Sequence, residues 1–389
     1  MLEILDRKQF TTPTPIQIQS IPTGIQGKDV VGIAQTGTGK TFAFGIPMIQ
    51  RLSQGKGRGL VILPTRELAE QVDDALKTFA SAFGIRTAVL IGGASMHKQR
   101  EAIRRDPRIV IATPGRLNDF LEQRMITLRE VEILVLDEAD RMFDMGFWPQ
   151  IKRILDHVPK ERQTMLFSAT MPHEVMELAR HQMRTPLRIE VAPAGTTVDK
   201  ITQEMFIVDK RDKTALLQQI LSQHPGTTLV FSRTKYGAKK IARDVRQMGH
   251  TSAEIHANRS LAQRREALDG FKTGKYRVLV ATDIAARGID VTGITLVVNY
   301  DLPSDAADYV HRIGRTARAG REGKAISFAT ADQQKDIRDI ERLIRVSIPR
   351  KITQGLPPRL VSTIPDRPDR PQTPRGGARK PRGHYSSRR

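Results

Sequence analysis

Short apolar runs rich in Val, Ile and Leu alternate with helical patterns along most of this 389-residue chain, and this rhythm limits the possible folds more than any other feature. The runs are DVVGIA at 29, GLVILP at 59, RIVIAT at 108, VEILVLD at 131, TMLFSAT at 164, TTLVFS at 227, YRVLVAT at 276, ITLVVNY at 294 and KAISFAT at 324. Apolar strands separated by helices are typical of mostly parallel sheets covered by helices on both faces. The sequence therefore predicts an α/β fold.

The runs form two series, separated by the stretch RIEVAPAGTTVDKITQ, which we interpret as irregular because Pro and Gly break both periodicities there. We expect one domain over residues 1–195 and a second over residues 200–346. Residues 347–389 are rich in Pro, Gly and Arg and have no apolar period, which predicts a disordered basic tail. The tail is either an arm for nucleic acid or for protein and ribonucleoprotein partners, or a segment that only improves solubility.

Charge and composition narrow the choice of partner. The net charge of +21 favours a polyanion, most commonly nucleic acid, and the alternative is a basic, solvated surface. No apolar run approaches the roughly 20 residues of a membrane helix. Cysteine is absent and the start has no secretory signal pattern. We therefore expect a cytoplasmic protein that does not associate with a membrane.

A glycine loop follows the first apolar run and opens a helical pattern, which is the strand, loop and helix order of a P-loop. Backbone N–H groups in such a loop approach phosphates, the lysine supplies charge at the outer phosphates, and the hydroxyl after it can ligate Mg²⁺. A helix-capping turn is the alternative. The candidate nucleotide-binding residues here are Ala34, Gln35, Thr36, Gly37, Thr38, Gly39, Lys40 and Thr41.

Two carboxylates complete a hydrolytic phosphate site. The apolar run at 131 leads directly into Asp137, which is therefore expected at the end of a buried strand, where it can hold Mg²⁺ together with Thr41. Glu138 follows, where a base could orient the attacking water. An acidic surface loop is the alternative, but the apolar residues before Asp137 argue against it.

A basic segment near the far end reads HRIGRTARAG, with Arg312, Arg315 and Arg318 at every third position behind His311. Residues three apart are neighbours on a helix surface, so these guanidinium groups are expected to converge on one anion. The spacing alone does not identify that anion.

With AQTGTGKT and DEAD both present, the chain resembles the DEAD-box family of ATP-dependent RNA helicases, and within it the bacterial RhlE type. The resemblance covers roughly residues 8–330. It implies two tandem RecA-like domains whose facing edges bind ATP with Mg²⁺, and RNA as the polymer. The further motifs, in order, are TPTPIQ at 12, PTREL at 64, GG at 92, TPGR at 113, SAT at 168, LVFSRT at 229, ATDIAARGID at 281 and HRIGRTAR at 311.

The resemblance assigns the anion and the catalytic roles. It makes Arg315 and Arg318 arginine fingers that reach the γ-phosphate from the second domain, with Lys40, Asp137 and Glu138 in the first. It also places His311 and Arg312 in a network across the cleft, Asp290 at the nucleotide, and Ser168 and Thr170 in the coupling of hydrolysis to RNA. An ordinary strand end is the alternative interpretation of Ser168 and Thr170.

Adenine recognition has candidates in and before TPTPIQ. The amide of Gln17 can donate and accept, as pairing with the N6 and N7 edge of adenine requires. The family places an aromatic ring nearby, here Phe10, and a further upstream aromatic would lie before Met1. Either the protein continues upstream or this stacking contact is missing. We expect Trp148 to be a packing residue beside the DEAD segment and not a base stacker.

RNA binding by resemblance runs across both domains and grips the sugar–phosphate backbone, largely without base specificity. A solvated surface charge is the alternative interpretation of each arginine taken alone. The family commonly has Gln where this chain has Leu261, and we still expect Arg264 to keep its role. The candidate RNA-binding residues are Arg66, Gly93, Thr113, Arg116, Arg233, Arg264, Thr282 and Gly288.

The sequence thus predicts an ATP-dependent RNA helicase in which ATP and RNA together close two domains. The same motifs also fit an ATP-gated RNA clamp or assembly platform with little unwinding. A P-loop motor acting on DNA or protein is a weaker third interpretation.

Overall fold

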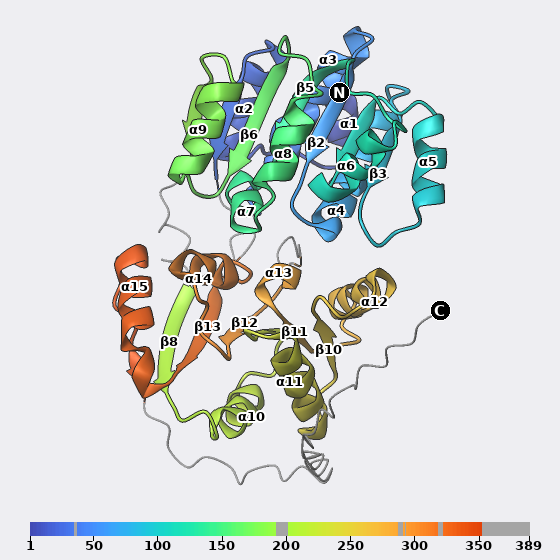
Figure 1. The fold of residues 1–389 in the computed structure, drawn as a ribbon. Coiled ribbons are helices and arrows are strands. Elements are labelled where there is room, and N and C mark those ends of the chain that lie inside the picture. The colour runs from blue at the N-terminus through green and yellow to red at the C-terminus, as the bar shows by residue number, and fades with distance from the viewer. Residues whose placement is uncertain (35–36, 192–200, 287–290, 292, 318–321, 352–389) are drawn as a thin grey trace, which may run out of the picture.

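The computed structural model describes residues 1–34, 37–191, 201–286, 291, 293–317 and 322–351. It contains two seven-stranded sheets, one in each half of the chain, and each sheet is packed between helices (Figure 1). The predicted α/β fold class with two tandem parallel sheets is confirmed. None of the helices in the described part of the chain is long and apolar enough to cross a membrane.

The first sheet has the strand order β3-β4-β2-β5-β6-β1-β7, and all its pairings are parallel. Parallel strands present all their carboxyl ends at one edge, so the loops that follow them gather there. The strands are β1 (Val30–Ile33), β2 (Arg58–Ile62), β3 (Thr87–Leu90), β4 (Ile109–Ala112), β5 (Val131–Leu136), β6 (Gln163–Ser168) and β7 (Leu187–Glu190).

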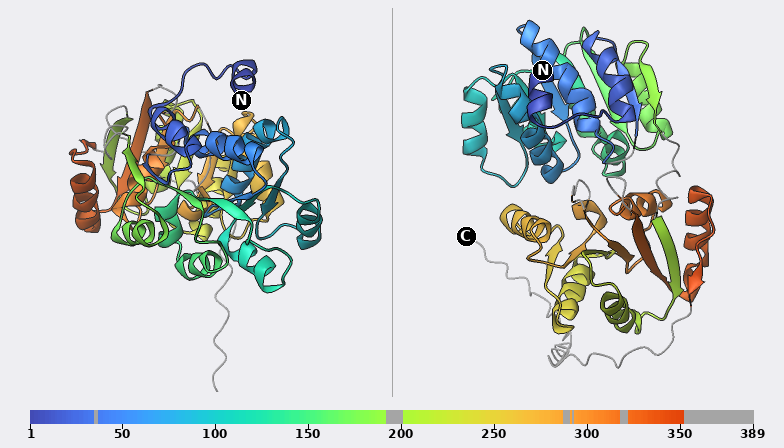
Figure 2. Two further views of the ribbon diagram at one scale, coloured as in Figure 1. Left: turned by 90° about the horizontal axis from the view of Figure 1, so that it is seen from above. Right: turned by 180° about the vertical axis from the view of Figure 1, so that it is seen from behind.

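Helices cover both faces of this sheet. One apolar layer includes Phe44, Val72 and Leu76 from α3 and α4, and the other includes Leu117, Ile154 and Leu178 from α6, α8 and α9. The right-hand view of Figure 2 shows the helices of this first layer from behind. The helices are α1 (Leu2–Arg7), α2 (Pro15–Ile25), α3 (Lys40–Gln54), α4 (Arg66–Ser81), α5 (Met96–Arg104), α6 (Pro114–Glu122), α7 (Ala139–Asp144), α8 (Trp148–Leu155) and α9 (His173–Gln182).

The second sheet repeats this plan with the order β10-β11-β9-β12-β13-β8-β14, again with parallel pairings. Its strands are β8 (Ile201–Ile207), β9 (Thr228–Phe231), β10 (Ser252–Ile255), β11 (Val278–Ala281), β12 (Leu296–Asn299), β13 (Gly323–Ala329) and β14 (Arg350–Lys351). Its helices are α10 (Lys213–Gln223), α11 (Lys235–Gln247), α12 (Leu261–Lys272), α13 (Asp283–Ala286), α14 (Ala306–Ile313), η2 (Ala331–Gln333) and α15 (Gln334–Ile344).

The structure corrects the interpretation of the segment between the two series. The stretch taken as irregular contains the end of β7 and the beginning of β8. Strand β7 lies at the edge of its sheet and buries only Ile189, so it lacks the continuous apolar run that marks a central strand. The predicted domain boundary, between residues 195 and 200, lies outside the described residues.

The expected start of the tail at residue 347 is also too early. Ile348 is 1% exposed, and β14 pairs with β8 through Arg350 and Met205. Glu341 of α15 accepts a hydrogen bond from the Ile348 backbone at 2.8 Å and pairs with Arg350 at 3.0 Å. A two-residue strand made of Arg and Lys has no apolar signature, which is why the sequence did not reveal it.

We expect a chain that ends at Lys351 to keep the stability of the second domain and a chain that ends at Val346 to lose about 2–4 kcal/mol. The shorter chain loses the burial of Ile348 and the pairing of β14 with β8. Urea unfolding of the two truncated proteins measures this difference. Equal unfolding midpoints would show that residues 347–351 contribute nothing to the domain.

Candidate active site

The P-loop lies between β1 and α3, as predicted. Gly39 is the N-cap of α3 and has φ of +88°, a left-handed conformation that favours glycine. A Cβ at this position would also collide with the Nε2 atom of Gln17. Gln17 Nε2 donates to the Gly39 carbonyl at 3.0 Å, so α2 holds the loop from the side.

Lys40 is buried at the start of α3, with 6% of the residue exposed. Its Nζ has no hydrogen-bond acceptor among the described residues. A buried ammonium without an acceptor is costly, so the site is built for an anion that arrives from outside the chain. This orphan cation at a helix N-terminus fits the outer phosphates of a nucleotide.

Asp137 and Glu138 follow β5 directly, at the same edge of the sheet as the P-loop. Asp137 is 3% exposed, and its Oδ1 accepts from the Glu138 backbone at 2.9 Å. Burial, opposed by the nearby Lys40 ammonium, raises the pKa of Asp137 to about 6. Glu138 is equally buried and has φ of +52°, a strained conformation that is uncommon for a residue with a side chain. A divalent cation would relieve the cost of these buried carboxylates.

Asp140 ties the DEAD segment to the SAT motif. Its Oδ2 accepts from the Thr170 backbone at 2.8 Å, from the Thr170 hydroxyl at 2.9 Å and from the Ala169 backbone at 3.1 Å. The Ser168 hydroxyl accepts from the Asp140 backbone at 3.1 Å. Burial opposes ionisation of Asp140, but the His311 ring, the Lys40 ammonium and the Thr170 hydroxyl outweigh it and lower its pKa.

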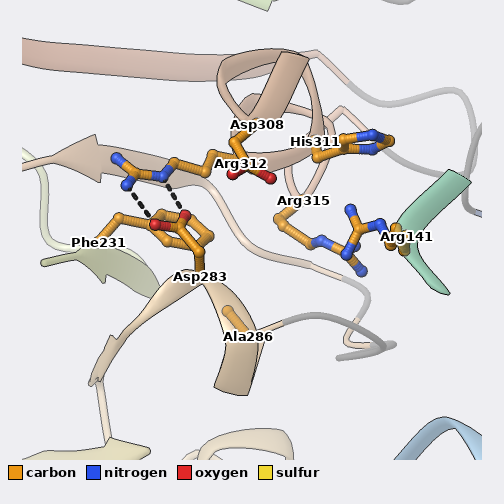
Figure 3. Close-up of a pocket in the computed structure, with 8 residues that line it drawn as sticks. All are labelled: Arg141, Phe231, Asp283, Ala286, Asp308, His311, Arg312 and Arg315. Atoms are coloured by element: carbon orange, nitrogen blue, oxygen red, sulfur yellow. Dashed lines mark hydrogen bonds and ion pairs between the residues drawn. The ribbon is translucent and has the colours of Figure 1, made fainter. Parts of the chain in front are cut away.

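Cations from both domains meet above this network. Figure 3 shows Arg141 of α7 facing His311 of α14 and Arg315 across the cleft. Burial and the neighbouring Arg141 hold the pKa of His311 well below its usual value. The cavity between them has a volume of about 10 Å³, room for roughly one water. Its lining residues are Arg141, Phe231, Asp283, Ala286, Asp308, His311, Arg312 and Arg315.

The structure corrects the prediction that three arginines converge on one anion. Arg312 is 2% exposed and forms two bonds to Asp283, at 2.5 and 2.7 Å, inside the second domain. Its guanidinium also lies 5.0 Å from the centroid of the Phe231 ring. Arg312 therefore orients α14 and is not available across the cleft. Arg318 lies outside the described residues.

The RNA-side candidates of the first domain lie together, at the carboxyl ends of β2, β3 and β4. Thr65 and Thr113 are the N-caps of α4 and α6. The Arg66 guanidinium covers Gly93, which has φ of +75°, and a Cβ there would collide with Arg66 Nη1. Arg116 donates to the Ala94 carbonyl at 3.3 Å. These contacts order one basic surface.

In the second domain, Arg233 and Thr282 follow β9 and β11, which pair with each other. Arg233 donates to the Leu302 carbonyl at 3.0 Å, and Thr282 receives a bond from the Ala286 backbone at the start of α13. Gln35, Thr36, Gly288 and Asp290, which the sequence also predicted as site residues, lie outside the described residues.

Arg264 requires a second correction, because it faces the first domain and not an open RNA surface. Its Nη2 lies 3.0 Å from Oε1 of Glu67, and the side chains are 11% and 6% exposed. Burial, opposed by Glu67, lowers the pKa of Arg264. The next residue, Arg265, pairs with Glu70 in a more exposed contact, and Leu261 packs against the core of the first domain. The first turn of α12 thus docks on α4.

The adenine candidates are only partly free. The Gln17 amide oxygen accepts from the Thr14 backbone at 2.9 Å while its nitrogen binds the P-loop. Phe10 is 48% exposed and packs edge-on against Phe42 at 4.9 Å. Trp148 stacks on Phe143 of α7 at 5.0 Å, which confirms the predicted packing role.

Comparisons with known proteins agree with this geometry. Residues 14–178 match the DEAD/DEAH box helicase model and residues 212–320 match the helicase conserved C-terminal domain. The ATP-dependent rRNA helicase RRP3 of Eremothecium gossypii is 42% identical over 356 residues, which cover 90% of this chain and 73% of that protein. The chain belongs to the DEAD/DEAH box helicase family. The ATP-dependent RNA helicase CshA of Listeria monocytogenes is 43% identical over 88% of this chain and 66% of that protein.

The predicted tandem RecA-like architecture of this DEAD-box protein is likewise confirmed. Its fold is similar to that of S. cerevisiae Dbp5 bound to RNA and ADP BeF3, with a TM-score of 0.81 and 28% identity over 90% of this chain and 93% of that one.

Sequence reasoning missed several residues of the DEAD-box site. Arg141 follows the DEAD tetrad directly, so its position was a usable signal. Its Nη1 is buried without a hydrogen-bond acceptor among the described residues. Asp283 and Glu67 lie inside motifs that the sequence did identify, but their partners lie 29 and 197 positions away and only the fold reveals them.

We expect Arg264→Met to reduce the closed population about a hundred-fold and Arg265→Met less than about five-fold. Loss of Arg264 leaves the Glu67 carboxylate buried and unpaired when the domains are closed, whereas Glu70 stays partly solvated. Fluorescence energy transfer between the domains, measured with ATP analogue and RNA, reports closure. The double variant Glu67→Met with Arg264→Met should recover most of the closed population. Equal losses in the two single variants would contradict the role of burial.

We expect Asp137→Asn to abolish ATP hydrolysis while raising the nucleotide-free stability by about 1–3 kcal/mol. The folded pKa of Asp137 lies above its unfolded value, so ionisation costs stability at pH 7 and protonation restores it as the pH falls through 6 toward 4. The Asn variant should lack the pH dependence of stability that Asp137 causes. Urea unfolding at pH 7 and at pH 4 measures this difference.

Asp29→Asn is the matched control for this prediction. Asp29 is also buried, but its carboxylate accepts from the backbones of Thr164 and Arg184, both at 2.7 Å. We therefore expect this variant to lose about 1–2 kcal/mol. Destabilisation by Asp137→Asn would show that the Asp137 charge is already compensated within the chain.

Proposed function

We propose how this protein, an ATP-dependent RNA helicase of the DEAD-box family, uses its cleft. ATP and single-stranded RNA together close the two RecA-like domains, and the closed arrangement excludes the complementary strand. Hydrolysis with product release reopens the cleft. The observation that carries this proposal is the meeting of Lys40 and Arg141 of the first domain with His311 and Arg315 of the second beside the DEAD carboxylates.

The nucleotide roles follow from burial and charge. Lys40 holds the outer phosphates, and the P-loop backbone around Gly37 and Gly39 supplies N–H donors. Thr41 and Asp137 would hold Mg²⁺, which when bound neutralises charge on the phosphates. Glu138 orients the attacking water and receives its proton. Further proposed nucleotide contacts are Phe10, Gln17, Ala34, Gln35, Thr36, Thr38 and Asp290.

The second domain completes the site only on closure. Arg315 and Arg318 stabilise charge on the transferred phosphoryl group, a role worth about 10³–10⁵ in rate where it has been measured. Arg312 acts indirectly, because its bonds to Asp283 fix α14, and Arg315 follows that helix directly after its C-cap. Asp140 links this arrangement through Ser168 and Thr170 to the rest of the first domain.

The RNA track follows the carboxyl ends of the strands in both domains. Phosphate and ribose contacts at helix N-termini carry no base information, so binding is largely independent of sequence. Arg264 contributes through its pair with Glu67 in PTREL. The proposed contacts to RNA are Arg66, Gly93, Thr113, Arg116, Arg233, Thr282 and Gly288.

Three further points belong to the same proposal. The similarity to a structure that holds both RNA and a nucleotide analogue supports a closed arrangement. A cytoplasmic location fits a protein that needs ATP and RNA. We also propose that the tail binds protein or ribonucleoprotein partners and that the protein is a member of the RhlE subgroup. Both proposals are based on the basic composition of residues 347–389.

We expect single-stranded RNA, but not matched DNA, to stimulate steady-state ATP hydrolysis strongly, and Arg315→Ala to remove the stimulation while RNA binding persists. Only closure brings Arg315 to the phosphates, so the variant separates binding from catalysis. Rates that do not change with RNA would contradict the proposal. Stimulation with stable RNA retention and no release of a short duplex would favour an RNA clamp over a helicase.

A further inference from the structure

Helix α11 exposes a row of basic side chains that the nucleotide site and the RNA track do not use. We call it the α11 basic surface and define it as Lys235, Lys239, Lys240, Arg243 and Arg246, with Arg259 from the loop after β10. Residues 235, 239, 243 and 246 are three or four positions apart and therefore form a row along the helix. The helix has 13 residues and is therefore about 20 Å long, and the row follows nearly all of it.

Few carboxylates balance these six cations. Within this surface the described acidic groups are Asp244, which pairs with Arg243 at 3.5 Å, and Glu254, which pairs with Arg259 and lies 3.9 Å from Arg246. Both carboxylates are buried, with 7% and 5% of the residues exposed. The surface that solvent meets is therefore basic throughout, with a surplus of four positive charges.

A second exposed helix of the same domain shows that this composition is not general. Helix α15 carries Lys335, Arg338 and Arg342, but Asp336, Asp339 and Glu341 alternate with them. Arg342 pairs with Asp339 at 3.5 Å, and Glu341 pairs with Arg350. Such balanced helices are typical of a solvated face, whereas α11 has the charge distribution of a polyanion site.

The α11 basic surface is continuous with the proposed RNA track. Arg233 of the track stands directly before Thr234, the N-cap of α11. Lys235 Nζ reaches across to Asn258 Oδ1 at 3.1 Å, which joins the first turn of α11 to the loop that carries Arg259. Because α11 starts at the carboxyl end of β9 and runs back along the sheet, its basic row leads away from the cleft.

An aromatic side chain stands at the cleft end of the row. Tyr236 is 71% exposed, and the Lys235 ammonium lies 5.3 Å from the centroid of its ring. An exposed ring beside cations is the combination with which proteins hold single strands, since bases stack on the ring while lysines and arginines follow the phosphates.

We propose that the α11 basic surface binds the RNA strand that continues beyond the cleft. This inference rests on the proposed function, because it extends the track of an RNA helicase to a second segment of the same strand. The surface increases affinity for long RNAs and anchors the enzyme next to the duplex, while the cleft alone supports hydrolysis. An acidic protein surface is the competing occupant, but the exposed Tyr236 and the continuity with Arg233 favour RNA.

The test compares two RNAs bound to the full chain with a non-hydrolysable ATP analogue. One is the shortest oligonucleotide that fully stimulates hydrolysis, and the other is extended by enough nucleotides to span roughly 20 Å. The variant is Lys239→Glu with Lys240→Glu, because both side chains are exposed. The control is Lys335→Glu with Arg338→Glu on α15, which changes the net charge equally.

We expect the α11 variant to weaken binding of the extended RNA about ten-fold and to lower its salt slope by roughly 1–2, with the short RNA and its stimulated hydrolysis unchanged. The control should bind both RNAs as the unmodified protein does. Equal losses for both RNAs, or in the control, would overturn the proposal. Unchanged binding of the extended RNA by the α11 variant would also overturn it. So would a result in which polyglutamate displaces the extended RNA from the unmodified protein but not from the variant. Failure of the short RNA to stimulate the unmodified protein would instead contradict the proposed function.

Discussion

Buried positive charge at the edge of the first sheet is the constraint on which the rest of the structure depends. Lys40 and Arg141 are buried there, and each has a nitrogen without a hydrogen-bond acceptor among the described residues, although Arg141 Nε also lies 3.7 Å from Glu138 Oε2. A folded domain tolerates such groups only when an anion binds there or when other interactions offset the cost. The parallel strand order makes this possible, because it brings the P-loop, the DEAD segment and the SAT motif to the same edge.

Asp140 connects this charge to the second domain. It accepts three hydrogen bonds from the SAT segment and lies near both Lys40 and His311. One carboxylate therefore interacts with the P-loop lysine of the first domain and with a histidine of the second domain. Loss of closure would remove the His311 contribution, while the bonds to Thr170 remain within the first domain. The network can therefore exist in open and closed states without unfolding, as a cycle of closure and reopening requires.

The sequence predicted the local parts of this site and missed those that depend on folding. The strand, loop and helix order at Lys40 and the end of a buried strand at Asp137 are encoded within a few residues, and both are found in the structure. The partners of Arg312 and Arg264 are Asp283 and Glu67, which no local pattern connects to them. Edge strands such as β7 and β14 were missed because a strand buried on one side, or only two residues long, lacks a continuous apolar run.

The two contacts between α4 and α12 explain how a basic protein can close and still reopen. Glu67 and Arg264 are buried when the domains meet, so their attraction is offset by the cost of removing both from water. Glu70 and Arg265 remain partly solvated and contribute little. Neither pair can hold the domains together strongly by itself. The free energy for closure must therefore come from the anions that satisfy the buried cations and the basic track, so nucleotide and RNA control the conformation together.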